Sequence, residues 1–253
     1  MPDSRAALIG GKGLARNVFW NLIGTIAPLI GALVAVPILI AGLGVERFGV
    51  LMLAWMLVGY FSLFDFGLGR ALTKLVAEKL GQERQGEIPS LVWTAMFLMA
   101  ALGVLGAVII AVLSPWVVLH ALRIPNELQI ESMQAFRTLV IAIPFVIAST
   151  GLRGMLEAYQ RFALINAVRI PLGVLMFLAP VFVLQFSSSL VTVISALVAV
   201  RLIAFLAFSA SCFFVEPALL RSIRISRAEI RPLINFGGWM TITNIIGPLM
   251  VYI

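Results

Sequence analysis

The chain has 253 residues, of which 62% are hydrophobic and only 11% are charged, and its formal net charge is +7. A water-soluble domain carries roughly 25% charged residues, so this composition requires lipid as the solvent and excludes a soluble enzyme. The single cysteine, Cys212, and the single histidine, His120, exclude a disulfide framework and His- or Cys-rich metal sites. We therefore expect no metal and no cofactor. The basic charge indicates basic cytoplasmic loops rather than nucleic-acid binding, since no soluble domain carries a basic patch.

Long apolar runs recur along the whole chain. A membrane-spanning helix needs about 20 mostly apolar residues, and six segments meet this length: 18–41, 48–68, 90–113, 134–156, 163–186 and 190–214. A seventh run begins near Leu233 and continues to Ile253. The runs are too long and too uniformly apolar for the alternating strands of a membrane barrel. The sequence therefore predicts an all-α, polytopic transmembrane bundle with six complete spans and the start of a seventh.

Lysine and arginine are distributed unequally between alternate loops. The N-terminal segment and the second, fourth and sixth loops hold three, four, two and four of them, whereas the other loops hold Arg47, Arg123 and, at a helix start, Arg137. Cytoplasmic loops of membrane proteins carry the excess of basic residues. We therefore expect a multi-pass protein of the bacterial cytoplasmic (inner) membrane, with its N-terminus in the cytoplasm.

The most basic loop divides the chain. We expect a cytoplasmic N-terminal segment (1–16), a first six-helix lobe (17–214), a basic inter-lobe loop (215–232) and the first helix of a second lobe (233–253). Six spans return the chain to the cytoplasmic side, so a second unit would repeat in parallel orientation, which is one known transporter plan. No basic flank or polar tail follows the seventh run. We expect the front part of a longer protein, the alternative being a short last helix.

Catalytic motifs such as G-x-S-x-G, the P-loop and H-E-x-x-H are absent from the sequence, and the informative residues are charges at membrane depth. Arg201 lies about twelve residues, or about 18 Å, into the sixth span. An arginine at mid-bilayer costs at least roughly 2.5–3.5 kcal/mol. The helical neighbours of Arg201 are apolar. Its partner is therefore another helix, a water-filled cavity or an anionic substrate, and the alternative to a functional role is a structural pair with a buried carboxylate.

Three further charged positions each have more than one interpretation. Arg169 shares a helix face with Asn166 and Gly173, and it either lines a cavity or extends toward the lipid head groups. Asp65 falls in the last turn of the second span, where a carboxylate opposes the helix dipole. It pairs with basic residues at the membrane surface or with an intramembrane arginine, or it carries a coupling proton. Arg137 near the outer end of the fourth span is equally ambiguous.

Polar or charged residues are spaced four apart in two further places. Arg153, Glu157 and Arg161 would form an ion-pair ladder on one helix face, which is typical of a solvated helix end. Asn17, Asn21 and Thr25 form a polar stripe on the first span. The stripe either forms hydrogen bonds between helices or lines a pore.

Two stretches carry a family resemblance. Leu43–Gly49 (LGVERFG) and Tyr60–Lys74 (YFSLFDFGLGRALTK) together resemble the Wzx-type polysaccharide and O-antigen flippases of the multidrug/oligosaccharidyl-lipid/polysaccharide exporter superfamily, and 239–248 resembles the start of that family's second half. The resemblance covers nearly the whole chain. It implies two six-helix lobes around a central cavity, of which this chain holds the first. It also implies alternating-access transport of a polyprenyl-diphosphate-linked oligosaccharide for surface polysaccharide biosynthesis.

The resemblance further implies which residues and partners serve transport. Arg169 and Arg201 would hold the diphosphate or acidic sugars, and Asp65 belongs to the family motif. Coupling to H⁺ or Na⁺ and association with a polymerase and other polysaccharide-assembly proteins would follow. The alternatives are a lipid II flippase or a multidrug/cation antiporter of the same superfamily, although arginine would repel a cation. Two alternatives lie outside transport: a membrane enzyme acting on polyprenyl phosphate, and a structural membrane subunit.

Overall fold

The computed structural model describes the backbone of residues 11–61, 65–121 and 124–251 and the side chains of residues 24, 26–61, 65–120 and 124–241. Within these ranges the regular structure is helical and contains no strand. The helices are α2 (Gly11–Leu43), α3 (Val45–Phe61), α4 (Leu68–Gly81), α5 (Ile88–Trp116), α6 (Asn126–Val140), α7 (Ala142–Ala158), α8 (Phe162–Leu184), α9 (Leu190–Val215), α10 (Ala218–Arg221) and α11 (Arg227–Val251). The predicted all-α bundle is confirmed.

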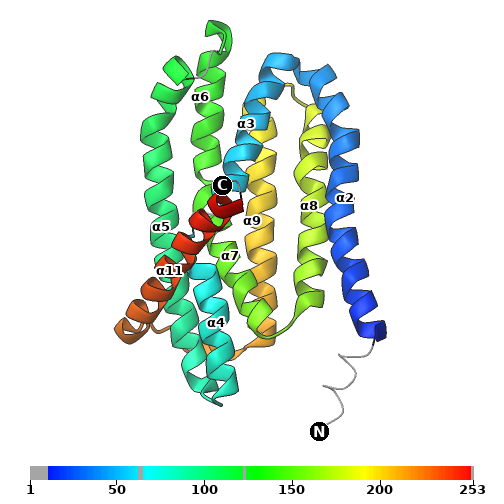
Figure 1. The fold of residues 1–253 in the computed structure, drawn as a ribbon. Helices are drawn as coiled ribbons and strands as arrows, with labels where there is room; N and C mark the ends of the chain where they lie inside the picture. Colours follow the sequence, from blue (N-terminus) through cyan, green and yellow to red (C-terminus); the bar gives the residue numbers. More distant parts are fainter. Residues whose placement is uncertain (1–10, 62–64, 122–123, 252–253) are drawn as a thin grey trace.

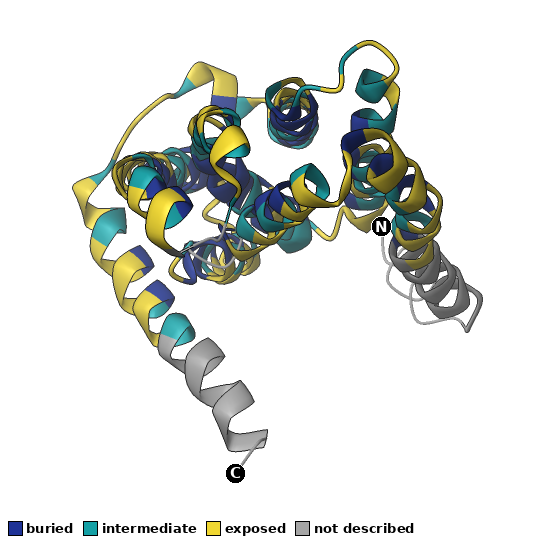
Figure 2. Ribbon diagram, turned by 90° about the horizontal axis from the view of Figure 1, so that it is seen from above, coloured by how far each residue is buried: buried dark blue, intermediate teal, exposed yellow. Residues whose placement is uncertain are grey.

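Five helical stretches of the described chain are long and apolar enough to cross a membrane: Ile26–Leu43, Gln85–His120, Asn126–Ala158, Phe162–Leu184 and Leu190–Val215. Large apolar side chains face outward along them, and Leu33 and Val112 are 77% and 71% exposed. Figure 2 shows this arrangement from above, with buried residues toward the inside of the bundle and exposed ones on its outside. Because so much exposed apolar surface requires lipid, the chain is a multi-pass membrane protein.

The helices surround one apolar core. In Figure 1, α2 and α8 lie side by side, α9 lies next to α8, and α7 connects this group to α5 and α6. Small residues bring α2 close to α8: a side chain at Gly173 would come within 2.8 Å of Pro28. This close approach sets the distance between α2 and α8.

The second predicted span, 48–68, is wrong in its C-terminal part. Helix α3 ends at Phe61, and a new helix, α4, starts at Leu68. The backbone before α4 is left-handed, with φ of 48° at Phe66 and 69° at Gly67. A continuous right-handed helix does not tolerate such angles. The apolar run therefore continues through a break that hydropathy does not detect.

The fourth predicted span, 134–156, is also interrupted. Helix α6 ends at Val140 and α7 starts at Ala142, with Ile141 between them. Pro144 lies four residues after Val140, and its ring nitrogen has no hydrogen to donate to the Val140 carbonyl. The amide of Ile141 bonds to the Thr138 carbonyl at 3.2 Å, so the chain tightens here before α7 continues in the same general direction.

The segment after α9 contains more helix than the predicted loop 215–232. Helix α10 forms within it, and α11 begins at Arg227. This segment, Glu216–Glu229, is held to the bundle by long-range bonds and is called the linker below. The Trp93 indole N–H donates to the Leu219 carbonyl (3.0 Å), and the Ser226 amide donates to the Thr94 hydroxyl (2.9 Å). Tyr159 donates to Glu216 (2.7 Å) and Lys79 to Glu229 (2.9 Å).

Helix α11 crosses in front of α4 and α5 (Figure 1). Its backbone touches the turn before α4, since a side chain at Gly67 would come within 2.5 Å of the Gly237 carbonyl. Lys74 of α4 lies over the ring of Phe236, 4.1 Å from its centroid. Glycine at both positions thus allows the first turns of α11 to pack directly on α4.

Candidate functional site

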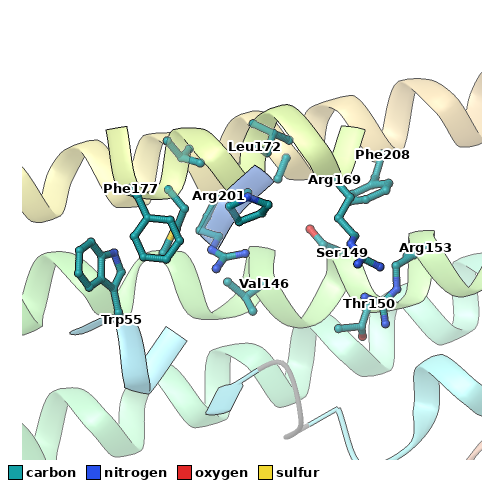
Figure 3. Close-up of a pocket in the computed structure, with 15 residues that line it drawn as sticks. Trp55, Val146, Ser149, Thr150, Arg153, Arg169, Leu172, Phe177, Arg201 and Phe208 are labelled. Carbon is teal, nitrogen blue, oxygen red and sulfur yellow. The ribbon is translucent and has the colours of Figure 1, made fainter. Parts of the chain in front are cut away.

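A cavity of about 380 Å³ lies between α2, α3, α7, α8 and α9. Figure 3 shows the side chains that line it, in two groups. One group contains Arg153 and Arg169 with the hydroxyls of Ser149 and Thr150, and the other contains Arg201 with aromatic and apolar residues. The remaining lining residues are Pro28, Trp55, Val146, Leu172, Gly173, Met176, Phe177, Val200, Ala204 and Phe208.

Arg201 reaches this cavity from the middle of α9. It is half-buried, and none of its described neighbours forms an ion pair with it. Its Nε atom is buried without a hydrogen-bond acceptor among the described residues. A structural pair of Arg201 with a buried carboxylate is therefore not formed by the described residues.

Arg169 reaches the same cavity from the first half of α8. Its guanidinium lies near the backbone of α2, where a side chain at Gly24 would come within 3.6 Å of Nη2. It forms no ion pair among the described residues, and its side chain is exposed. Figure 3 shows it pointing toward Ser149 and Arg153 on α7. Two arginines that are distant in sequence therefore open onto one space.

Arg153 is the third arginine of the cavity, and it is paired. Its Nε lies 3.2 Å from Oε1 of Glu157, one turn later on α7. The predicted pair Arg153–Glu157 is present, but its extension to Arg161 is wrong. Helix α7 ends at Ala158, and the left-handed Gln160 (φ 56°) redirects the chain before Arg161 precedes α8.

The charge of the cavity is therefore positive. No aspartate or glutamate belongs to its described lining, and only Arg153 has a carboxylate partner nearby. In low-dielectric surroundings an uncompensated guanidinium attracts anions strongly. Arginine also offers paired donors that match carboxylate and phosphate groups. The arrangement is suited to holding an anionic group.

Asp65 lies next to the cavity rather than in it. The sequence places it at the C-terminal end of a span, but in the structure it precedes α4. Its Oδ1 accepts the Gly67 amide (3.0 Å), and its Oδ2 accepts the Gly69 amide (3.1 Å). The Thr150 hydroxyl shares its hydrogen between this Oδ2 (3.1 Å) and the Ile147 carbonyl (2.7 Å). The expected position against the helix dipole is wrong, because this carboxylate is at the N-terminal end of α4, where negative charge is favourable.

Two predicted site residues lie away from the cavity. Arg137 is exposed on α6, and Asn166 is half-buried on α8, and neither lines the cavity. The side chains of Asn21 and Thr25 lie outside those that the structure describes.

Aromatic residues of the cavity were not predicted. Trp55 of α3 packs against Phe177 of α8, with ring centroids 5.1 Å apart. Trp55 Nε1 is buried without an acceptor among the described residues, as is Nε of Arg201. Tryptophan and phenylalanine are common in membrane spans, so no signal in the sequence marks these two.

The comparisons with known proteins agree with this architecture. The model of the polysaccharide biosynthesis protein family matches residues 14–253. The chain belongs to this family. A Shigella flexneri protein named "Putative O-antigen transporter" is 28% identical over 240 residues, which are 94% of this chain and 56% of that protein. The family member described here thus spans about half the length of that relative.

Two solved structures share the fold. One is a MATE protein in complex with MaD3S, with a TM-score of 0.74, 16% identity, and coverage of 94% of this chain and 54% of that one. The other is a MOP superfamily transporter from Pyrococcus furiosus, described by a binding pocket of reverse polarity, with a TM-score of 0.72, 15% identity, and coverage of 94% and 53%. The polysaccharide biosynthesis family member therefore has the fold of half a MOP transporter.

Proposed function

We propose that the protein is a membrane transporter that moves a polyprenyl-diphosphate-linked oligosaccharide across the cytoplasmic membrane for surface polysaccharide biosynthesis, by alternating access. The observation that supports this most is the arginine-lined cavity, whose described lining includes no carboxylate. Arg169 and Arg201 form no ion pair among the described residues, and a diphosphate would supply the negative charge that they lack. Bidentate arginine–phosphate contacts are among the strong hydrogen bonds.

The same observation argues against a cation as cargo. A cationic drug in this cavity would meet uncompensated guanidinium groups and would be repelled. An antiporter of the same fold would need acidic residues at this position, and the described lining has none. A lipid II flippase would bind the same diphosphate chemistry, so it differs from our proposal only in the attached sugars.

The proposal includes the organisation of the whole protein. Residues 17–214 would form the first lobe, 233–253 would begin a second lobe, and the two lobes together would enclose the transport pathway. This is supported by the share of the relatives that the chain matches, 56% of one and 54% of another. Either H⁺ or Na⁺ would serve as the coupling ion, and the polymerase and other assembly proteins would be partners.

The decisive test uses the full-length protein in a host that lacks its own flippase. We expect Arg201→Ala and Arg169→Ala to abolish polymer export while the amount of membrane-inserted protein stays unchanged. Arg201→Lys, which keeps the charge but not the bidentate geometry, should retain part of the export. Arg137→Ala is the matched control, because Arg137 is exposed on α6 and does not line the cavity.

Either of two results would contradict the proposal. Normal export by both Arg201→Ala and Arg169→Ala would mean that the cavity arginines do not hold the cargo. Loss of the inserted protein would mean that they serve folding. Surface polymer is quantified by immunoblot, and insertion by membrane fractionation.

A further inference from the structure

An apolar groove lies at the surface of the bundle, where α11 crosses in front of α5 (Figure 1). Its volume is about 440 Å³, and it shares no described lining residue with the arginine-lined cavity. The walls come from α5, from α11 and from the turn before α4, and they include Phe66, Leu68, Leu98, Leu102, Ile234 and Gly238. The described lining carries no charged side chain. The groove therefore suits a hydrocarbon chain.

A glycine keeps this groove open. Gly237 and Gly238 are neighbours on α11, but their surroundings differ. A side chain at Gly237 would come within 2.9 Å of the Phe66 carbonyl, whereas a side chain at Gly238 would meet no described atom within 4 Å. Gly237 therefore serves packing, while Gly238 leaves space. Apolar walls beside an empty space lose their dispersion contacts, and in a membrane a lipid chain is the molecule at hand to restore them.

The face of α11 that borders the groove also carries two arginines. Arg227, Arg231, Ile234 and Gly238 follow one another at intervals of four, three and four residues, so they share one face of the helix. All four are exposed, whereas Leu233 on the opposite face is buried. One face of α11 thus runs from positive charge at the start of the helix to the apolar groove.

The two arginines have no carboxylate partner among the described residues. Glu229 lies between Arg227 and Arg231 in sequence, but Lys79 engages it at 2.9 Å. Arginine offers paired donors that match a phosphate group, and its guanidinium is weakly hydrated. Two such side chains at the end of a membrane helix are suited to the phosphate of a lipid head group.

The spacing between the arginines and the groove fits one lipid chain. The start of α11 is held beside Lys79 through Glu229, and Leu68 at the groove lies eleven residues before Lys79 on α4. At 1.5 Å per residue, this separation is about 16 Å. One leaflet supplies half of the roughly 30 Å hydrocarbon core. A chain whose head group sits at the arginines therefore reaches the groove within one leaflet.

We propose that an anionic phospholipid of the surrounding membrane, of the phosphatidylglycerol type, occupies this site. Its phosphate pairs with Arg227 and Arg231, and one acyl chain lies in the groove between α5 and α11. This goes beyond the proposed function, because the lipid is a resident ligand and not cargo, and it does not enter the arginine-lined cavity. A phosphatidylcholine has the same chains, but its own cation compensates its phosphate. The site therefore selects lipids by head-group charge.

Native mass spectrometry of the purified full-length protein, titrated with dioleoyl phosphatidylglycerol or dioleoyl phosphatidylcholine, measures this selection. We expect the wild type to bind phosphatidylglycerol about thirtyfold more tightly, because two basic residues near the membrane surface contribute. The double variant Arg227→Gln/Arg231→Gln should lose this preference. Arg221→Gln/Arg224→Gln is the matched control, because these two linker arginines are also exposed but precede α11. The control should keep the preference.

Gly238→Phe tests the groove separately from the head-group site. The ring should occupy the space of the acyl chain and weaken binding of both lipids by about tenfold or more, with the ratio of the two affinities unchanged. In the wild type, a phosphatidylglycerol with a photoreactive diazirine in one chain should label residues 98–105 of α5 or 234–238 of α11. Thermal unfolding checks the fold of each variant, and the labelling requires no variant.

Each of the following results would overturn the inference. Equal affinity of the wild type for the two lipids, or equal losses in the two double variants, would remove the head-group site. Labels confined to other helices would remove the chain from the groove. Displacement of phosphatidylglycerol by a much lower concentration of undecaprenyl phosphate would assign the site to a polyprenyl carrier instead of a membrane phospholipid.

Discussion

The role that the sequence suggests for Asp65 differs from the role that its contacts in the structure indicate. As the end of a predicted span it suggests a coupling proton or a surface pair. In the fold it receives the amides of Gly67 and Gly69 and the hydroxyl of Thr150. Its carboxylate thus caps the start of α4 and ties α4 to α7 beside the cavity. Helix capping explains its position without any role in transport.

Substitution at Asp65 separates the two roles. Asp65→Ala removes every acceptor and should lower the stability of the full-length protein by about 1–2 kcal/mol, measured by thermal unfolding in detergent. Asp65→Asn keeps one acceptor oxygen and should lose less stability and retain export. Thr150→Val, which removes only the hydroxyl, is the control for the α4–α7 tie. An Asp65→Asn variant with full stability and no export would assign the coupling proton to this residue instead.

The sequence was sufficient to find Arg169 and Arg201, because a charge within an apolar run is conspicuous by its cost in lipid. It could not identify Trp55 or Phe177, because aromatic side chains are ordinary there. Periodicity alone could not connect Arg169 with Arg201, since they reach one cavity from two helices; only the family resemblance assigned them a common role. Pairs formed over long sequence separation, such as Arg47 with Glu131, lie outside what periodicity can predict.

At the scale of helices, composition predicts where apolar segments lie but not where they break. The bounds of α5, α8 and α9 agree closely with the predicted spans. The breaks after α3 and α6 depend on backbone geometry at Phe66–Gly67 and on Pro144, which hydropathy averages away. The position of the linker could not be predicted from composition either, because its bonds to Trp93, Thr94 and Tyr159 join segments that are far apart in sequence.

Lys79 attaches the linker to α4 through an ion pair with Glu229. Its ammonium lies 2.7 Å from Glu87 and 2.9 Å from Glu229, and its side chain is 11% exposed. Burial alone lowers the pKa of Lys79, but the two carboxylates outweigh this effect and hold the pKa above its usual value. The stabilisation is therefore complete below the ordinary lysine pKa and is lost only as pH rises through the raised one. Lys79 stays charged at physiological pH.

Removing this charge should release the linker. Lys79→Met leaves Glu229 buried without a partner, which is strongly destabilising for a buried pair. We expect trypsin cleavage after Arg221 and Arg224 of the full-length protein to accelerate roughly tenfold. Arg84→Ala is the control, because Arg84 pairs with Glu87 on an exposed surface, where an ion pair contributes little. Unchanged cleavage in Lys79→Met would show that the other bonds hold the linker alone.

At the scale of the molecule, the distribution of basic residues predicts the orientation in the membrane. The linker and the N-terminal end of α2 lie at one end of the bundle, and the α8–α9 connection lies at the other (Figure 1). If the positive-inside rule holds for this chain, the first end faces the cytoplasm.

Reporter fusions test this orientation. A periplasm-active phosphatase fused after Ser187 should be active, and a cytoplasm-active galactosidase fused after Arg227 should be active. The exchanged fusions serve as controls and should be silent. Activity of the exchanged pair would reverse the topology and, with it, the leaflet from which Arg153 and Arg169 are reached.

The contact between Gly67 and Gly237 has a mechanical consequence. The linker and the first turns of α11 are bound to α4 and α5 through Lys79, Thr94 and the Lys74–Phe236 pair. We therefore expect this part of α11 to move together with α4 and α5. Gly237 and Gly238 follow immediately, and glycine pairs are where helices bend most easily. We therefore expect the hinge for any rocking of the chain beyond this point to lie inside the helix, at the glycine pair, and not in the basic loop.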